Sequence, residues 1–331
     1  MHVSTARPVS LFIALLLLSL AGLAGALLVG SVPLAFSEVL SILAGGGTEP
    51  WRTIVLELRL PRALAAFSVG GLLALAGALL QVLLRNPLAD PYVLGTSGGA
   101  AVGALLAMLA GLSGAALGGS AFAGALLSTL LVFGIARRGG DWSPTRLLLT
   151  GIIMASAWGA LIAFILTIAP EHNLRGMLFW MMGDIRSGDL PWTALLILLL
   201  MLIFSWLLAR PLNLLARGEL QAITLGVSVR PLRATLYLLA ALGTATAVTL
   251  AGSVGFVGLI IPHLLRLAGA RDHRILLPAS VLAGGALLLI ADTLARTLWA
   301  PQQFPVGILT AAIGIPVFLF LLLRTRAEVH A

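Results

Sequence analysis

The chain has 331 residues, of which 60% are hydrophobic and only 10% are charged, and its mean hydropathy is +1.09. Soluble domains carry about 25% charged residues, so this composition indicates a membrane protein and leaves no room for a large extramembrane catalytic or nucleotide-binding domain. The formal charge of +8 comes from basic residues that are all arginine, and the absence of lysine and cysteine excludes a Walker phosphate loop, disulfides and thiolate metal sites.

Uncharged apolar runs follow one another along the chain, and each is a candidate transmembrane helix. They span residues 9–29, 63–84, 92–112, 115–135, 147–169, 192–209, 234–265, 275–291 and 306–323. The first run resembles a cleavable signal, but its length of about 20 residues exceeds the usual 7–15, which favours a retained helix. The run 234–265 contains Gly252, Gly255, Gly258 and Pro262, which favour a break into two helices.

The distribution of arginines supports that break. With two helices in the run 234–265, 14 arginines lie on the cytoplasmic side and 6 lie outside, whereas one helix gives 10 and 10. The sequence therefore predicts an all-α integral membrane protein with ten transmembrane helices and both termini in the cytoplasm. One transmembrane domain over residues 1–331 is the simplest organisation.

Small residues recur inside the apolar runs. Gly99 and Gly103 are four residues apart, and Gly70, Ala74 and Gly77 share one helix face. Such faces allow close helix packing in a membrane. The alternative is that they leave a wide lumen for a bulky substrate.

Ionisable residues are almost absent from the middle of the runs. The twelve acidic residues lie in loops or near run ends, with Asp292 close to the outer end of the ninth helix. His263 and His273 flank a cytoplasmic turn and lack metal-ligand spacing. An intramembrane enzyme or an ion-coupled carrier would need charged groups near the midplane. We therefore expect no catalytic residues, metal or cofactor in this chain, and an energy source in a partner.

Two cytoplasmic segments are distinctive. Residues 84–91 read LRNPLADP, in which two prolines predict a turn of fixed shape instead of a flexible linker. Residues 211–233 form the longest cytoplasmic loop, whose apolar positions recur near a helical period and predict one or two short amphipathic helices. Such helices lie on lipid or fit a groove in a partner. The shortage of basic residues in the middle of the loop favours the partner.

Six arginines lie on the predicted outer side, against the usual charge bias, and three of them are at the outer ends of predicted helices. These three are Arg59, Arg62 and Arg296. One explanation is a salt bridge to Glu57 or Asp292. The other is a positive rim that captures acidic residues of a docking protein.

Seven segments in order resemble the iron-complex and vitamin B12 permease family of ABC importers. They are RLPR at 59–62, GALLQ at 77–81 leading into RNPLADP at 85–91 and LGTSGGA at 94–100, TRLLLTG at 145–151, FWMMG at 179–183, GFVGLIIPHLLR at 255–266, DHR at 272–274 and PVGILT at 305–310.

The resemblance implies a type II ABC importer permease in the inner membrane of a bacterium. It implies a homodimer that pairs with two cytoplasmic ATPase subunits, which bind ATP and Mg, and with a periplasmic binding protein that delivers the substrate. The substrate classes implied are haem, ferric siderophores and cobalamin. A secondary carrier or an intramembrane enzyme are the rival classes, and both lack the residues they would need.

The resemblance also assigns roles by position. Arg59, Arg62 and Arg296 match outer arginines that meet the binding protein. Proline at 144 is expected to stiffen the second gate loop, and Gln302-Gln303-Phe304 replaces a carboxylate that is usual in the family. The remaining assigned residues are Asn86, Pro87, Leu88, Ser143 and Pro144 for the cytoplasmic gate, and Gly218, Glu219, Leu225 and Gly226 for ATPase docking.

Overall fold

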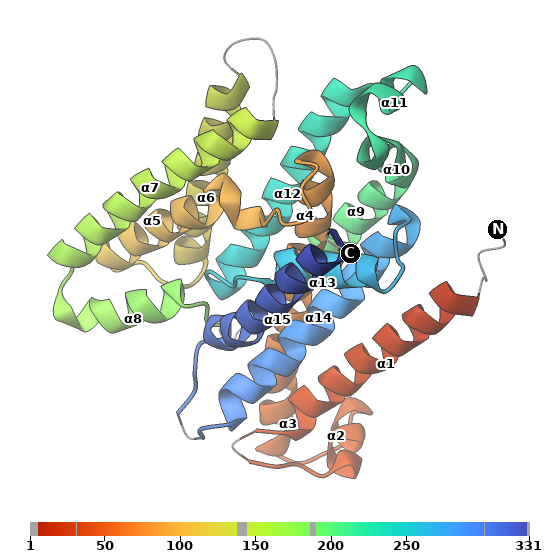
Figure 1. Ribbon diagram of the computed structural model, residues 1–331. Helices are drawn as coiled ribbons and strands as arrows, with labels where there is room; N and C mark the ends of the chain where they lie inside the picture. Colours follow the sequence, from red (N-terminus) through yellow and green to blue (C-terminus); the bar gives the residue numbers. More distant parts are fainter. Residues whose placement is uncertain (1–5, 31, 138–143, 186–189, 301, 330–331) are drawn as a thin grey trace.

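The computed structural model describes residues 6–30, 32–137, 144–185, 190–300 and 302–329, and every regular element within these ranges is a helix (Figure 1). In chain order they are α1 Ala6–Leu28, α2 Phe36–Leu43, α3 Trp51–Thr53, the π-helical η1 Ile54–Arg59, α4 Leu60–Leu83, the 3-10 turn η2 Pro91–Leu94, α5 Thr96–Leu109, α6 Gly114–Arg137, α7 Pro144–Ile168, α8 Glu171–Met181, α9 Trp192–Leu207, α10 Ala209–Arg217, α11 Glu219–Thr224, α12 Val229–Ala251, α13 Val257–Leu267, α14 His273–Thr297 and α15 Val306–Val329.

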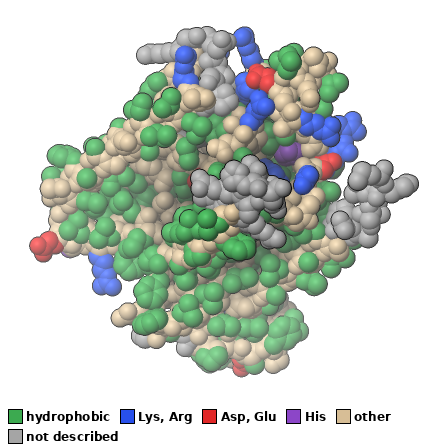
Figure 2. Space-filling model, in the orientation of Figure 1, with side chains coloured by type: hydrophobic (Ala, Val, Ile, Leu, Met, Phe, Trp, Pro, Cys, Tyr) green, Lys and Arg blue, Asp and Glu red, His purple; other side chains and the backbone are tan. Residues whose placement is uncertain are grey.

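Within the described ranges, six helical stretches are long and apolar enough to cross a membrane, and a seventh candidate is the pair α9 and α10, bent by 61° at their junction. Three further apolar helices are shorter: α5, α13 and the part of α15 up to Phe320. Hydrophobic side chains cover most of the visible face, and arginines gather toward the end that carries α10 and α11 (Figure 2). The α10–α11 end is therefore the more charged end of this face, and the α2–α3 end lies opposite it (Figures 1 and 2).

Helix α4 is the centre of the bundle. Residues 68–83 are all buried, and α4 packs against α9, α12, α13 and α14 (Figure 1). A helix that is apolar all round can be buried on every side, which explains why this run has no polar face. By contrast, α7 leaves Ile152, Ile153 and Phe164 exposed, so its apolar surface is available to lipid or to another chain.

The small-residue faces serve helix packing. A methyl group added at Gly70 would overlap the carbonyl of Gly284 on α14, and one added at Gly99 would overlap the carbonyl of Gly124 on α6. Only glycine permits these backbones to approach so closely. The packing interpretation is confirmed at these positions, which do not line a lumen within this chain.

The break predicted in the run 234–265 is confirmed. α12 ends at Ala251, and α13 begins at Val257 after Gly252, whose φ is +63°. The expected short helices of the loop 211–233 are also present, as α10 and α11. α10 begins at Ala209, two residues before the predicted loop, because the bend falls at Leu208.

Two helices were not expected from the sequence. α8 carries Glu171, His172 and Arg175, and its composition does not resemble an apolar run. α2 is a short helix that packs on α1 and η1. Both cover the ends of longer helices, a role that depends on tertiary contacts instead of on a long apolar run.

Candidate functional site

The turn after α4 has a shape set by main-chain hydrogen bonds. The Asn86 N–H donates to the Gln81 carbonyl at 3.1 Å, and the Arg85 N–H donates to the Val82 carbonyl at 3.2 Å. This pair of bonds is the Schellman arrangement that closes a helix C-terminus. The Asn86 side-chain oxygen then accepts the Leu88 N–H at 2.9 Å. Pro87 and Leu88 are exposed beyond it, and the gate role of Asn86, Pro87 and Leu88 stays a prediction.

Gln81 joins this turn to α13. Its amide nitrogen donates to the Leu259 carbonyl at 3.1 Å and to the Ala89 carbonyl at 3.4 Å, and its side-chain oxygen accepts from Arg266. The side chain is buried, so these bonds satisfy an amide that would otherwise be costly to bury. The sequence analysis did not assign Gln81 a role, although a lone amide in a buried apolar run is a signal for one.

Asp90 and Tyr92 extend the connection to the break between α12 and α13. The Asp90 Oδ1 accepts the Tyr92 N–H at 2.8 Å and so caps η2, while the Tyr92 hydroxyl accepts the Val254 N–H at 3.1 Å. Burial raises the pKa of Asp90 to about 6 and also raises the pKa of Tyr92. The Ser97 and Ser253 hydroxyls meet at 3.0 Å. The turn after α4 and the α12–α13 break therefore form one hydrogen-bonded unit.

The second predicted gate lies at the start of α7. Pro144 is the first residue of that helix, which suits proline because the first turn needs no N–H donor there. Ser143 lies outside the described residues. The gate role of Ser143 and Pro144 stays a prediction.

The two short helices α10 and α11 meet at Gly218, whose φ of +147° and ψ of +146° favour glycine. Glu219 begins α11 and forms a salt bridge of 2.7 Å with Arg233 on α12. Three apolar side chains of this segment are exposed: Leu220, Leu225 and Ile223, at 77%, 65% and 53%. Gly226 follows with a φ of +84°.

Exposed apolar side chains at this density are typical of a docking surface. Leu220 and Ile223 are therefore stronger candidates for contact residues than the two glycines that the family resemblance assigns, whose role is to shape the backbone. The ATPase-docking role of Gly218, Glu219, Leu225 and Gly226 stays a prediction.

A second contact fixes α10 to the start of α14. The Asn213 Nδ2 donates to the Asp272 carboxylate at 2.8 Å, and the Asn213 Oδ1 accepts the His273 N–H at 3.0 Å. The Asp272 carboxylate also caps α14 by accepting the Arg274 N–H at 2.9 Å. The Asn213 amide and the Arg274 N–H lower the pKa of Asp272, although its partial burial opposes this. Movement of α10 would therefore pull directly on α14.

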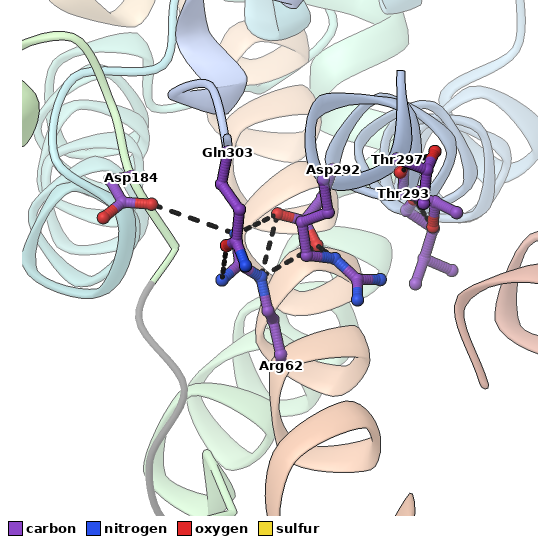
Figure 3. A network of polar contacts seen from close by, with 8 residues as sticks. Arg62, Asp184, Asp292, Thr293, Thr297 and Gln303 are labelled. Atoms are coloured by element: carbon purple, nitrogen blue, oxygen red, sulfur yellow. Dashed lines mark hydrogen bonds and ion pairs between the residues drawn. The ribbon is translucent and has the colours of Figure 1, made fainter. Parts of the chain in front are cut away.

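At the α2–α3 end, Arg62 and Arg296 share the carboxylate of Asp292 (Figure 3). The Arg62 guanidinium contacts this carboxylate at 2.9 Å and 3.1 Å, and the Arg296 Nε donates to it at 3.1 Å. Gln303 and Asp184 face Arg62 from the other side, at 3.5 Å and 3.9 Å. The predicted salt bridge to Asp292 is thus confirmed for both arginines.

Arg59 has a different environment. It is 5% exposed, and its guanidinium donates to the Leu27 and Leu28 carbonyls at the end of α1 and to the Val32 carbonyl beyond it. Within the described residues, Arg62 pairs with Asp292 and Asp184 and Arg296 pairs with Asp292, and none of the three outer arginines pairs with Glu57. In this conformation Arg59 and Arg62 offer little surface, and binding-protein docking by Arg59, Arg62 and Arg296 stays a prediction.

Comparison with known proteins identifies the fold and the family. The FecCD transport family model matches residues 11–324. The chain belongs to the FecCD transport family. It is 43% identical over 278 residues to a vitamin B12 import system permease protein BtuC of Klebsiella pneumoniae, with 82% of this chain and 83% of the relative covered. It is also 41% identical over 313 residues to the permease of the same name from Shigella boydii. That alignment covers 89% of this chain and 94% of the relative.

A solved structure described as an inward-facing metal-chelate type ABC transporter aligns with 95% of this chain and 99% of its own, at a TM-score of 0.82 and 33% identity. The FecCD chain is therefore the permease of an ABC-type importer, a multi-pass membrane protein and a transporter instead of an enzyme. This confirms the family resemblance found in the sequence. FecCD membership also implies ATPase and substrate-binding partners.

Proposed function

We propose that this permease imports vitamin B12. The observation that carries the proposal is its 41–43% identity, over most of both chains, to permeases named for vitamin B12 import. Ferric siderophores and haem are the alternative substrates. They are supported by the 33% identity to the solved structure described as a metal-chelate type ABC transporter. A lumen lined mainly by apolar helices suits a bulky ligand more than a small ion, because it offers few groups to replace an ion's hydration shell.

We infer that the chain forms ten membrane spans with both termini in the cytoplasm of a bacterial cell. Six long helices, the bent pair α9 and α10, and the three shorter apolar helices α5, α13 and α15 together support this number. The α10–α11 end is then cytoplasmic and the α2–α3 end is periplasmic. A reporter enzyme that works only in the cytoplasm should be active when it is fused after Arg326. Activity of a reporter that works only in the periplasm, fused at the same position, would contradict this topology.

Partner ATPase subunits supply the energy in this proposal. They bind ATP and Mg, so the permease itself needs no cofactor, and they dock on α10 and α11 through the exposed Leu220, Ile223 and Leu225. A second copy of the chain completes the pathway, with the exposed apolar face of α7 as the surface available for it. The periplasmic binding protein delivers substrate at the opposite end.

The contacts at the α10–α11 end suggest how the partners open the gate. Asn213 links α10 to the start of α14, and Glu219 links α11 to α12. Gln81 links the turn after α4 to α13. A displacement of the docking helices would therefore reach α12 and α14 directly, and α13, to which Gln81 joins the gate turn at residues 86–88, packs against α14.

The test is uptake by proteoliposomes that contain the permease with its ATPase subunits and binding protein. Radiolabelled cyanocobalamin should accumulate with ATP, while a ferric siderophore and haem should not. Accumulation of an iron complex in place of cyanocobalamin would contradict the substrate, and uptake driven by a proton gradient without ATP would contradict the mechanism. A preparation without ATPase subunits is the control.

A further inference from the structure

A cavity of about 680 Å³ lies at the α10–α11 end, and its wall carries four arginine side chains from four separate segments. They come from the turn after α4, the last residue of α10, the end of α13 and the loop before α14: Arg85, Arg217, Arg266 and Arg271. A concave surface on which polar groups converge from several segments has the form of a small-ligand site. A flat charged face would have the form of a solvated surface.

The cavity has an excess of positive charge. Among the described wall residues Asp272 is the one acidic side chain, and it already accepts hydrogen bonds from the Asn213 amide and the Arg274 N–H. None of the four arginines forms a salt bridge with a described residue, and Arg266 contacts the neutral Gln81. A bound anion would relieve the repulsion between these guanidinium groups.

The backbone at Arg85 supports a binding role for its side chain. Arg85 has a φ of +49°, in the left-handed region, at the position after a helix where glycine is usual. The bonds that close the helix come from main-chain groups, so the cap itself requires no side chain. A non-glycine residue there costs conformational energy. A role of the Arg85 side chain in the cavity would explain why arginine occupies this position in spite of that cost.

His273 adds a group of another kind to the wall. The Asn213 Nδ2 donates to Asp272, so the Asn213 Oδ1 is an acceptor, and it lies 2.6 Å from the His273 Nδ1. The Nδ1 therefore carries the proton, and the Nε2 is a lone-pair acceptor. That Nε2 is buried and has no hydrogen-bond partner among the described residues. With almost no accessible surface on the Nε2, the imidazole belongs to the wall through its contact with Asn213 and offers the cavity no hydrogen bond.

We propose that this cavity binds a phosphate-bearing anion. Inorganic phosphate in its monohydrogen form and the glycerol phosphate headgroup of phosphatidylglycerol both have this chemistry. Guanidinium forks match phosphate oxygens, and basic pockets between helices on the cytoplasmic side are suited to anionic headgroups. The concave wall favours such a ligand over an acidic segment of a partner protein.

The experiment uses the purified permease–ATPase complex in two arms. In one, equilibrium dialysis measures binding of labelled inorganic phosphate in detergent. In the other, the complex is reconstituted in nanodiscs of phosphatidylcholine with and without phosphatidylglycerol, and native mass spectrometry counts retained lipid. The variants are Arg85→Gly and Arg271→Gln, with Arg52→Gln, an exposed arginine at the α2–α3 end, as the matched control.

Each variant should weaken binding about tenfold, the loss expected for one charge-assisted hydrogen bond, and the control should not. Arg85→Gly should keep or raise the melting temperature, because glycine suits its backbone, which separates loss of binding from loss of folding. Binding in the phosphate arm assigns free phosphate, and binding only in the lipid arm assigns the headgroup. No binding in either arm, or binding that both variants leave unchanged, would overturn the proposal. Loss of ATPase association without phosphate or lipid binding would overturn it too, in favour of protein docking.

Discussion

Asp292 accepts three hydrogen bonds from Arg62, at 2.9 to 3.1 Å, although the two residues are 230 positions apart in the chain. The contact joins the first turn of α4 to the last turns of α14, and both side chains are buried, at 10% and 2% exposed. Arg296 approaches the same carboxylate from one turn further along α14. Two arginines therefore share the Asp292 carboxylate at the α2–α3 end of the bundle, and Asp184, 3.9 Å from Arg62, is a second and more distant acidic group.

Replacing Asp292 with asparagine should destabilise the permease strongly. The change removes the nearest counter-ion of the buried Arg62 guanidinium and leaves Asp184 at 3.9 Å, and breaking a buried pair on one side costs about 3–5 kcal/mol. Denaturant unfolding in mixed micelles measures the loss. Arg296→Gln is the matched control and should cost less, because it leaves the Arg62–Asp292 contact intact. Equal stability of the native chain and Asp292→Asn would show that the carboxylate is not needed.

Arg296 tests binding-protein docking with the Arg62–Asp292 contact left in place. Its side chain is 11% exposed, close to the 10% of Arg62, so the melting temperature of Arg296→Gln is measured alongside to separate lost docking from lost stability. Arg296→Gln should slow association with the binding protein several-fold and reduce its salt dependence, as expected for a charge at the edge of an interface. Biolayer interferometry at two salt concentrations measures both. Arg210→Gln, exposed on α10, is the control, and an unchanged association rate for Arg296→Gln would remove this residue from the docking surface.

Much of the fold was predictable because its signals are local. The glycines and proline between residues 252 and 262 marked the break between α12 and α13, and the apolar period of the loop 211–233 marked two short helices. The small residues on one face of the helix predicted that Gly70 would contact another helix closely. The sequence did not predict that the partner would be Gly284 on α14.

The details of the site depend on contacts between distant segments. Asp292 was one of two possible partners for the outer arginines, and only the packing of α4 on α14 decides between them. Arg59 was expected at the outer rim because its bonds to the carbonyls at the end of α1 have no sequence signal. The helix α8 escaped prediction for a related reason, because its polar residues look like a loop until neighbouring helices place it.

Leu220 and Ile223 should be required for ATPase docking. Both are more than half exposed on α11, and an aspartate at either position would place a charge in an apolar contact with a partner, at a cost of several kcal/mol for two such changes. Copurification of the ATPase subunits with the Leu220→Asp/Ile223→Asp double variant should fall at least tenfold. Leu298→Asp, which is 60% exposed on the far side of the chain, is the control. Full copurification of the double variant would place the docking surface elsewhere.

Asp90 should make the stability of the gate turn depend on pH. Burial raises the pKa of its carboxyl from 3.8 to about 6, so the folded state binds the proton more tightly than the unfolded state does. The stabilisation from this proton is complete below pH 3.8 and is lost as the pH rises through about 6. The melting temperature of the native chain minus that of Asp90→Asn should therefore fall between pH 4 and pH 7. Asparagine keeps an oxygen for the Tyr92 N–H but does not titrate.

Asp90→Ala separates this titration from the cap. Alanine has no acceptor for the Tyr92 N–H, so the variant should be less stable than Asp90→Asn by about 1 kcal/mol at every pH in the range. Thermal unfolding in detergent, followed by circular dichroism at half-unit pH steps, measures all three proteins. If the melting temperature of the native chain minus that of Asp90→Asn stays constant or rises with pH, the folded protein does not hold the Asp90 proton. In that case the gate turn would carry a full negative charge throughout the physiological range.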